Sequence, residues 1–249
     1  MALHSGASPI FFNNPCIEEY VPYPTQLSSY VPPEFQSGRE QLIDGQSLGI
    51  CDAELRKTWD TTQAFCALVN YAAESERKIP QETFLDSMAS ALYRLVGMKF
   101  PVDSLDEAVR LGLSAFCSHV FLQWSSFRPP HHHLPTVYKQ CLTEHLCSDS
   151  MALSEPMPWL LMVGAMAVFP KGDTWLWPWL RRATGVPGSD ASGSWGEIRA
   201  SMKRLLWIDF VHDRRGEATY NSVRRPSPLA TEDNNHTAQA YLGIEPSLS

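Results

Sequence analysis

Apolar residues recur every three to four positions through the middle of the chain, which is the spacing of an amphipathic helix. One such stripe runs from Asp52 to Ala73. A second follows Pro80, which suits a first helical turn, and stops at Gly97, which commonly ends a helix. The inward positions of the two are Leu55, Trp59, Phe65, Cys66, Val69 and Ala73, then Phe84, Leu85, Met88, Leu92 and Leu95. The pattern predicts two long helices.

Two Ser-x-x-Glu sequences mark further helix starts as capping boxes, in which the serine oxygen accepts the amide three residues on and the glutamate reaches back. The first, Ser104 to Glu107, opens a helix that ends before Pro129. The second, Ser194 to Glu197, opens the last helix. The expected inward residues are Leu105, Val109, Phe116 and Val120 in the first, and Ile198, Met202, Leu205, Leu206 and Phe210 in the second.

Three more helices are predicted between these two. One follows the histidine-rich segment at 129–135 and buries a face from Leu134 to Leu142. Residues 158–169 are apolar on all sides, as expected of a central buried helix. Asp173 caps a short aromatic helix. Strand signals are almost absent, so the fold class is all-α: an irregular multi-helix bundle of about seven helices.

The two ends of the chain lack this periodicity. Residues 1–50 are rich in proline and serine, and are either a linker or a strap lying on the helices. Residues 51–213 form the helical domain. Residues 214–249 are polar and are predicted to be a disordered tail. We therefore expect one domain with flexible N- and C-terminal segments.

The charge is unevenly distributed. The net charge of −7 disfavours phosphate-backbone binding by the whole surface. Residues 199–225 contain seven basic and three acidic residues, so this segment carries +4 and the remainder −11. It is either a solvated helix face with a basic tail, or a patch for nuclear import or partner docking. The pairs Arg214-Arg215 and Arg224-Arg225 weakly resemble a bipartite import signal.

Cysteine usage and apolar runs indicate a reducing, intracellular setting. None of the six cysteines forms a Cys-x-x-Cys pair, and the first residues show no signal-peptide pattern. The longest apolar run, Met157 to Phe169, is too short to span a bilayer. We expect no membrane association.

Histidines are the most conspicuous candidates for metal chemistry. His131, His132 and His133 are consecutive, so on a helix they point in different directions, whereas a helical zinc site favours positions i and i+4. In an extended chain His131 and His133 can share a face, yet the flanking prolines favour a surface loop. Cys141, His145 and Cys147 have a Cys-x3-His-x-Cys spacing without an evident fourth ligand. We predict no metal site and no cofactor.

Acid–base chemistry has one candidate, the group Asp209, His212 and Asp213. The alternative is the charged end of the last helix, with His212 favourable near its C-terminal dipole. No Gly-x-Ser-x-Gly sequence, P-loop or dinucleotide fingerprint is present. The late tryptophans can line a ligand pocket, although at helical spacing they more often pack a core. We expect no catalytic residues.

Three sequences together resemble the C-terminal part of fungal zinc-cluster transcription factors. They are EPMPWLLMVGAMAVF at 155–169 followed by a tryptophan-rich segment, SWGEIR at 194–199, and LLWIDFVHD at 205–213. The resemblance covers roughly residues 50–215 and implies an all-helical regulatory domain. Trp195, Trp207, Asp209, His212 and Asp213 match the motifs and are expected to define the fold rather than a site.

The resemblance stops short of the family's DNA-binding module. That module places six cysteines within about thirty residues to hold two zinc ions, whereas here they are spread from Cys16 to Cys147. The implied function is an accessory regulator in the nucleus, possessing no DNA contact of its own. It would act on a clustered, secondary-metabolite pathway with a full-length zinc-cluster protein, a second copy or a small effector as partner. The alternative is a small metal-dependent or pocket enzyme using His131, His133 and His145, or Asp209, His212 and Asp213.

Overall fold

The computed structural model describes residues 21–25, 27–32, 35, 42–121, 133–146, 154–170, 173–184 and 193–224. Over these residues the chain forms eight α-helices and no strand, which confirms the all-α bundle of about seven helices. The α-helices are α4 (Ala53–Glu74), α5 (Gln81–Gly97), α6 (Leu105–Phe121), α7 (His133–Leu146), α8 (Met157–Val163), α9 (Trp177–Ala183), α10 (Trp195–Arg204) and α11 (Asp209–Arg224). A 3₁₀ turn, η1, spans Leu27–Tyr30, and a π-helical turn, η2 (Gly164–Val168), extends α8.

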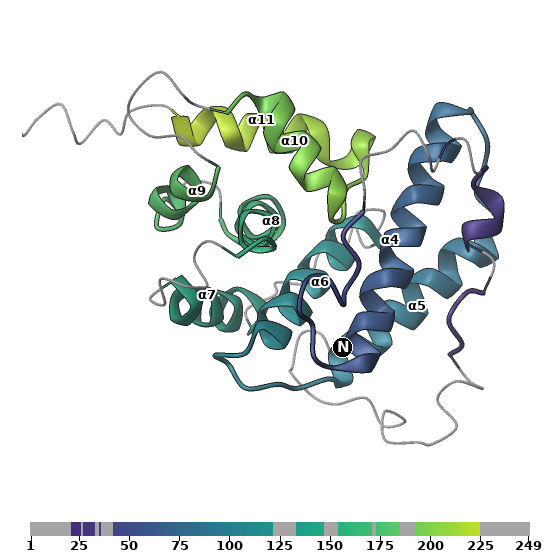
Figure 1. Ribbon diagram of the computed structural model, residues 1–249, viewed down its shortest axis with the longest axis horizontal. Coiled ribbons are helices and arrows are strands. Elements are labelled where there is room, and N and C mark those ends of the chain that lie inside the picture. Colours follow the sequence, from purple (N-terminus) through teal and green to yellow (C-terminus); the bar gives the residue numbers. More distant parts are fainter. Residues whose placement is uncertain are drawn as a thin grey trace, which may run out of the picture.

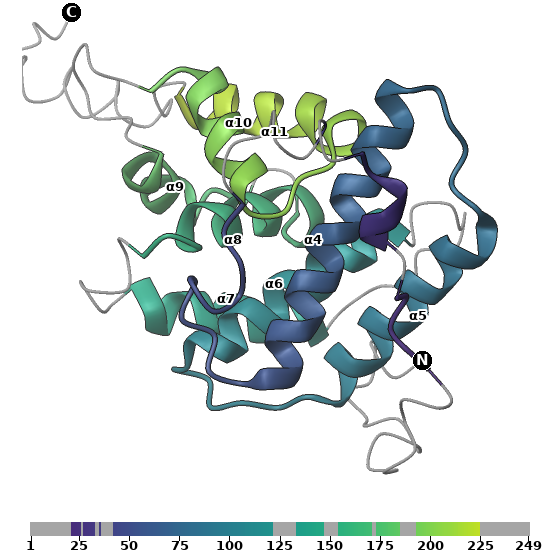
Figure 2. The same cartoon turned by 45° about the vertical axis from the view of Figure 1, so that its right-hand side comes forward.

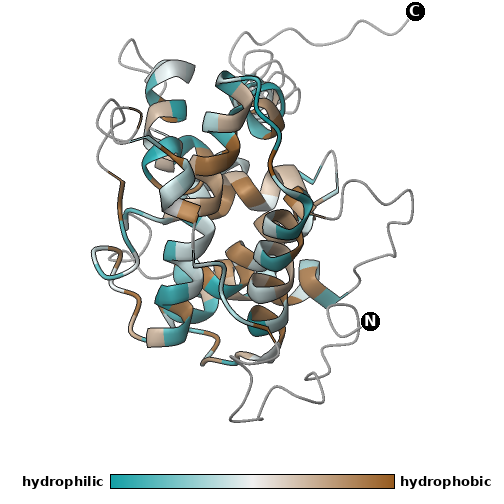
Figure 3. Cartoon of the chain, turned by 90° about the vertical axis from the view of Figure 1, so that its right-hand side faces the viewer, coloured by the Kyte–Doolittle hydropathy of each residue, from teal (hydrophilic) through white to brown (hydrophobic). Residues whose placement is uncertain are grey.

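The helices pack in two groups around α6. Helices α4, α5 and α6 lie against one another, while α7 and α8 contact α6 from the other side and α9 packs on α8 (Figure 1). Helices α10 and α11 lie across one end of the bundle (Figures 1 and 2), where α11 contacts α9 and η2. The faces that the helices turn toward one another are predominantly apolar (Figure 3). No helix in the described ranges is long and apolar enough to cross a membrane.

The centre of the core is the crossing of α6 and α8. Trp159 of α8 is fully buried and its ring centroid lies 5.2 Å from that of Trp59 on α4. Its indole Nε1 donates to the carbonyl of Leu206, 2.9 Å away. Gly112 on α6 makes this approach possible, because a Cβ there would lie 2.9 Å from the Trp159 ring and would also collide with Leu160. The predicted buried helix at 158–169 is central as far as Val163, but the π-helical turn η2 that follows is only partly buried at 165–168.

The predicted last helix is two helices. Helix α10 starts at the Ser194 capping box, with both hydrogen bonds formed, but its helical hydrogen bonding ends at Arg204 and Leu205 adopts φ −97° and ψ −104°. Residues 205–208 are four consecutive apolar residues, and all are at most 2% exposed. On a continuous helix four such residues would point in nearly all directions around the axis, so the chain leaves the helix to bury them together.

Other local expectations need correction. Leu85 and Ala73, predicted to face inward, are exposed. The disordered tail predicted from residue 214 is wrong for residues 214–224, which belong to α11. Ser104 accepts from the Glu107 amide, but the Glu107 carboxylate binds Arg110 at 2.6 Å instead of completing the capping box. Asp173 accepts from the Trp175 amide at 3.4 Å and precedes the first residue of α9 by four positions.

The described parts of residues 1–50 lie on the helical domain. Ile43, Leu48 and Ile50 are buried in the core, and the Ile43 amide donates to the carbonyl of Arg204. Tyr23 reaches α4, where its hydroxyl lies 2.8 Å from Thr58 Oγ1. The domain therefore includes chain ahead of residue 51. Residues 1–20 and 225–249, on which the expectation of flexible ends also rests, lie outside the described ranges.

Candidate functional site

The histidines and cysteines considered as candidate ligands do not converge in the described residues. His131 and Cys147 lie outside those residues. His133 is exposed at the start of α7, whereas His145 is buried near its end, about 18 Å away at the rise of an α-helix. The His145 Nε2 lies 3.0 Å from the carbonyl oxygen of Ser104. The Cys141 thiol points to the carbonyl of Val102 at 3.2 Å, and burial raises its pKa to about 12.

Across the described ranges, no group of three or more histidine, cysteine, aspartate or glutamate residues could hold a metal ion. Burial raises the pKa of the Cys117 thiol to about 12, as it does that of Cys141.

The second candidate group does converge, in what we call the α11 joint: Arg199, Trp207, Asp209, His212 and Asp213. Arg199 on α10 donates to both oxygens of Asp213, at 2.8 Å each, and to Asp209 at 2.9 Å. Trp207 Nε1 donates to Asp213 at 2.7 Å. The hydrogen bonds from Arg199 and Trp207 hold the pKa of Asp213 below its ordinary value despite partial burial. These carboxylates close the turn between two helices.

His212 is the buried member of the joint, at 1% exposed. Its Nδ1 accepts from the Ile208 amide at 3.0 Å. The ring stacks on Phe116 at 4.9 Å and lies 5.6 Å from the ring of His119. Burial, reinforced by the neighbouring His119, lowers the pKa of His212 to about 3, so the imidazole is neutral near pH 7. A neutral, sealed imidazole packed in this way anchors α11 on α6.

Two amides on α4, which the sequence analysis did not identify, complete the joint. Asn70 donates to the Trp207 carbonyl and accepts from the Asp209 amide, both at 2.9 Å. Gln63 donates to the carbonyls of Ile43 and Leu205, both at 3.1 Å. These bonds satisfy backbone groups that the break after α10 leaves without helical partners. Amides inside an otherwise apolar helical stripe are the only signal that could have identified them.

An apolar pocket of about 510 Å³ opens beside this joint. It lies between α4, the turn after α4, α5, the end of α6 and the start of α11. Its lining residues are Phe65, Val69, Ala72, Ala73, Arg77, Lys78, Ile79, Gln81, Phe84, Val120, Ile208, Phe210 and Val211. Phe210, predicted to face inward, is instead 68% exposed at the mouth. It is the most exposed large apolar side chain among the described residues.

The turn after α4 brings two cations to this pocket. Glu76 has φ 55°, in the left-handed region that non-glycine residues seldom adopt, and the Arg77 amide donates to the Ala72 carbonyl at 2.8 Å. This is the long hydrogen bond of a Schellman helix end. It turns the chain so that Arg77 and Lys78 reach the rim, and both side chains are exposed. Neither forms an ion pair with a described acid, although the Arg77 guanidinium lies 5.6 Å from the Tyr71 ring centroid.

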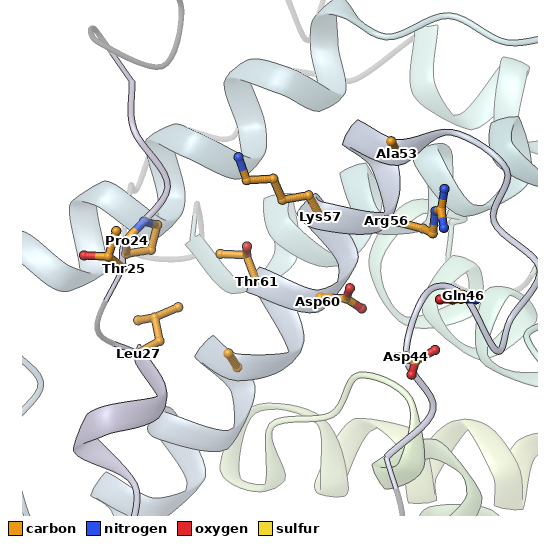
Figure 4. A pocket seen from close by; sticks show the side chains of 11 residues that line it. Pro24, Thr25, Leu27, Asp44, Gln46, Ala53, Arg56, Lys57, Asp60 and Thr61 are labelled. Carbon is orange, nitrogen blue, oxygen red and sulfur yellow. The ribbon is translucent and has the colours of Figure 1, made fainter.

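A second hollow, of about 620 Å³, is polar and its charges are largely engaged (Figure 4). Figure 4 shows Lys57, Asp60 and Thr61 extending from α4 between the segments at 24–27 and 44–46. Asp60 accepts from the Gly45 amide at 2.9 Å, and Lys57 lies over the Tyr23 ring at 4.4 Å. Burial raises the pKa of Asp60 above its ordinary value. The contacts of Asp60 and Lys57 hold the N-terminal segment on α4.

Two of the late tryptophans, Trp159 and Trp207, are core residues, whereas Trp175, Trp177, Trp179 and Trp195 are partly buried and pack against the core. Trp159 and Trp207 are at most 2% exposed, and the apolar pocket is lined by none of the tryptophans.

No protein-family model, no curated protein and no solved structure matches the chain.

Proposed function

We propose that this chain is an accessory transcriptional regulator that works by binding, as its resemblance to the regulatory domain of fungal zinc-cluster transcription factors implies. The observation that carries the proposal is the α11 joint. Trp207, Asp209, His212 and Asp213 match the motif of that resemblance, and they meet in one structure that fixes α11 on α4, α6 and α10. A motif whose members serve one structural purpose supports a shared fold more strongly than separate matches do.

The joint also weighs against the enzyme alternative. The two carboxylates of the candidate triad are bound to Arg199, and the imidazole is buried against Phe116. A general base must lie within hydrogen-bond reach of a substrate proton, and His212 at 1% exposed offers no such approach. We therefore propose binding as the activity of the folded domain.

The proposal extends to location and partners. The chain would act in the nucleus without a DNA contact of its own, through a full-length zinc-cluster protein or a second copy of itself, on genes of a clustered pathway. Arg214, Arg215 and Arg224 lie on α11, where Arg224 stacks on Tyr220 at 5.4 Å and Arg215 approaches His119 at 3.2 Å. These basic residues would serve import, with Arg225 beyond the described ranges.

Transcript profiling of a strain lacking this gene tests the proposal against its parent and a strain complemented with the intact gene. We expect a small, co-located set of transcripts to change together and to recover on complementation. Unchanged transcripts under conditions in which the gene is expressed would reject the regulatory function. Replacing Arg224 and Arg225 by glutamine tests the import signal separately, since unchanged nuclear fluorescence of a tagged chain would remove that part alone.

A further inference from the structure

The apolar pocket has the dimensions and lining of a small-molecule site. Its volume of about 510 Å³ falls inside the range of ligand pockets, roughly 300–1,000 Å³. Phe65 of α4, Phe84 of α5 and Ile208, from the break between α10 and α11, form its apolar walls. A pocket of this volume, walled by three segments, suits an alkyl chain better than the long face of a partner helix, which needs an extended groove.

The rim adds a charge preference. The lining contains two cations, Arg77 and Lys78, and one neutral amide, Gln81, but no acidic residue. Glu74 and Glu76 are near in sequence, and they are exposed without lining the pocket. A ligand whose apolar part fills the pocket would therefore place its polar end beside positive charge, and an anionic end is favoured there.

We propose that this pocket binds an amphipathic carboxylate, with its apolar body between α4, α5 and α11 and its carboxylate at Arg77 and Lys78. The Schellman turn at Glu76 positions both cations, while Phe210 lines the pocket from α11 with 68% of its side chain exposed. The role of this ligand as an effector rests on the regulatory function proposed above. Its binding does not, because the pocket and its rim exist in the folded domain whatever the domain regulates.

The pocket and the α11 joint share one segment of the chain. Ile208 and Val211 line it, and the same segment carries Asp209 and His212 of the α11 joint. A bound ligand therefore contacts the chain where α10 gives way to α11. Because a ligand that binds only the folded state stabilises it by mass action, binding raises the melting temperature of the domain.

The binding test uses the full-length chain and 11-(dansylamino)undecanoate as a fluorescent probe, displaced by dodecanoate or by dodecanol. Dodecanoate is expected to displace the probe with at least threefold higher affinity than dodecanol. Replacing Arg77 and Lys78 together by glutamine should weaken dodecanoate about threefold to tenfold and leave dodecanol unchanged, since two exposed ion pairs are lost. The matched control, Lys57→Gln, removes an exposed lysine from the other hollow of α4 and should change neither ligand.

A second variant fills the pocket without disturbing the core. Ala73 is exposed and lines the pocket, so Ala73→Trp should abolish binding of the probe and of both displacing compounds while far-ultraviolet circular dichroism stays unchanged. Equal dodecanoate affinity in the wild type and either pocket variant would overturn the proposal, as would equal affinity for dodecanoate and dodecanol. Selective binding of an acidic amphipathic peptide in place of dodecanoate would also overturn it.

The two proposals fail separately. If Ala73→Trp abolishes dodecanoate binding in vitro and the transcripts of the deletion strain are unchanged, the pocket stands and the regulatory function is lost. If those transcripts change but no amphipathic carboxylate binds, the regulator stands and the ligand is lost. Complementation of the deletion strain with Ala73→Trp tests whether the pocket is needed for regulation. If the transcripts fail to recover, the ligand of this pocket is the effector.

Discussion

Two neighbouring regions of the molecule share residues 207–213 and use them in opposite ways. On one side, His212 and Asp213 enter the α11 joint, where Asp213 binds Arg199 and Trp207 and His212 accepts from the Ile208 amide. On the other side, Phe210 and Val211 line an apolar pocket whose mouth carries Arg77 and Lys78. The histidine and the carboxylates, which could perform acid–base chemistry, therefore lie in the α11 joint and not in the pocket.

This difference indicates which of the two regions can bind a ligand. Histidine and carboxylates attract attention in a sequence because they can perform acid–base chemistry, but in the α11 joint they satisfy one another and a break in the backbone. Phe210 is unremarkable in the sequence, yet it leaves a large apolar side chain 68% exposed beside cations without a described acidic partner. An exposed apolar group at the rim of a concavity is the better indicator of a binding site here.

The largest effect is expected on the sealed side, from Asn70→Leu. This change removes the side-chain partners of the Trp207 carbonyl and the Asp209 amide, leaving two backbone groups unpaired in the interior. It should lower the free energy of unfolding by about 2–4 kcal/mol, measured by urea denaturation. Gln81→Leu is the matched control on the pocket side, because Gln81 is exposed, and it should stay within about 0.5 kcal/mol. Similar losses from both variants would contradict the contrast between the regions.

The next effect is a pH dependence caused by His212. Burial lowers its pKa from 6.5 to about 3, so between these values the unfolded chain binds a proton that the folded chain excludes. The free energy of unfolding should therefore fall as the pH drops from 7 to 5, by about 2 kcal/mol from this group alone. His212→Asn should remove that part of the pH dependence. His133→Asn, which replaces an exposed histidine, should retain it, and the same pH profile for both variants would argue against a buried neutral imidazole.

Close packing against α11 predicts a smaller loss. A Cβ at Gly216 would lie 2.7 Å from the ring of Trp195 and 2.8 Å from that of Trp207. Gly216→Ala should thus lower the free energy of unfolding by about 1–2 kcal/mol, after the helix preference for alanine offsets part of the collision. Gly196→Ala serves as control, because its Cβ would meet only the Ser194 hydroxyl, at 3.6 Å. That variant should be neutral or slightly stabilised, and a rise in stability for Gly216→Ala would show that the two rings can move apart.

The helices were predictable because their local causes lie within a few residues. The Asp52–Ala73 stripe and the Ser194 capping box depend on spacing and on side chains three or four positions apart. The break at residues 205–208 was not, because those residues leave the helix for a core that α4 and α8 build from distant parts of the chain. Local periodicity cannot report what a distant helix will cover.

The candidate site was predictable only in its sealed half. Asp209, His212 and Asp213 were identified as a group from their spacing, and the structure brings them together with Arg199. The pocket joins Phe65, Phe84 and Ile208, which are widely separated in sequence and typical of core residues. Its position depends on the left-handed turn at Glu76, a residue type that gives no hint of that conformation.

A substitution in the left-handed turn at Glu76 is expected to raise the free energy of unfolding instead of lowering it. Glu76 pays a steric cost at φ 55° that glycine does not, since the Cβ of an L-residue crowds the backbone in the left-handed region. Glu76→Gly should raise the free energy of unfolding by about 0.5–1 kcal/mol, after the greater flexibility of glycine in the unfolded chain offsets part of the relief. Glu74→Gly, at the last residue of α4, should lower it instead. A loss of stability in Glu76→Gly would place the carboxylate in an interaction that outweighs the strain.

The smallest change in stability is expected at the most exposed residue of the pocket. Phe210→Ser removes a ring that is already 68% exposed, so the free energy of unfolding should stay within about 0.5 kcal/mol of the wild type. Ile208→Ala, only two positions earlier but on a fully buried side chain, should lose about 2–4 kcal/mol. Urea denaturation of the two variants side by side measures how sharply this short segment passes from interior to surface. A cost at Phe210 comparable with that at Ile208 would mean that the ring is covered in solution, and the pocket mouth would then be closed by the protein itself.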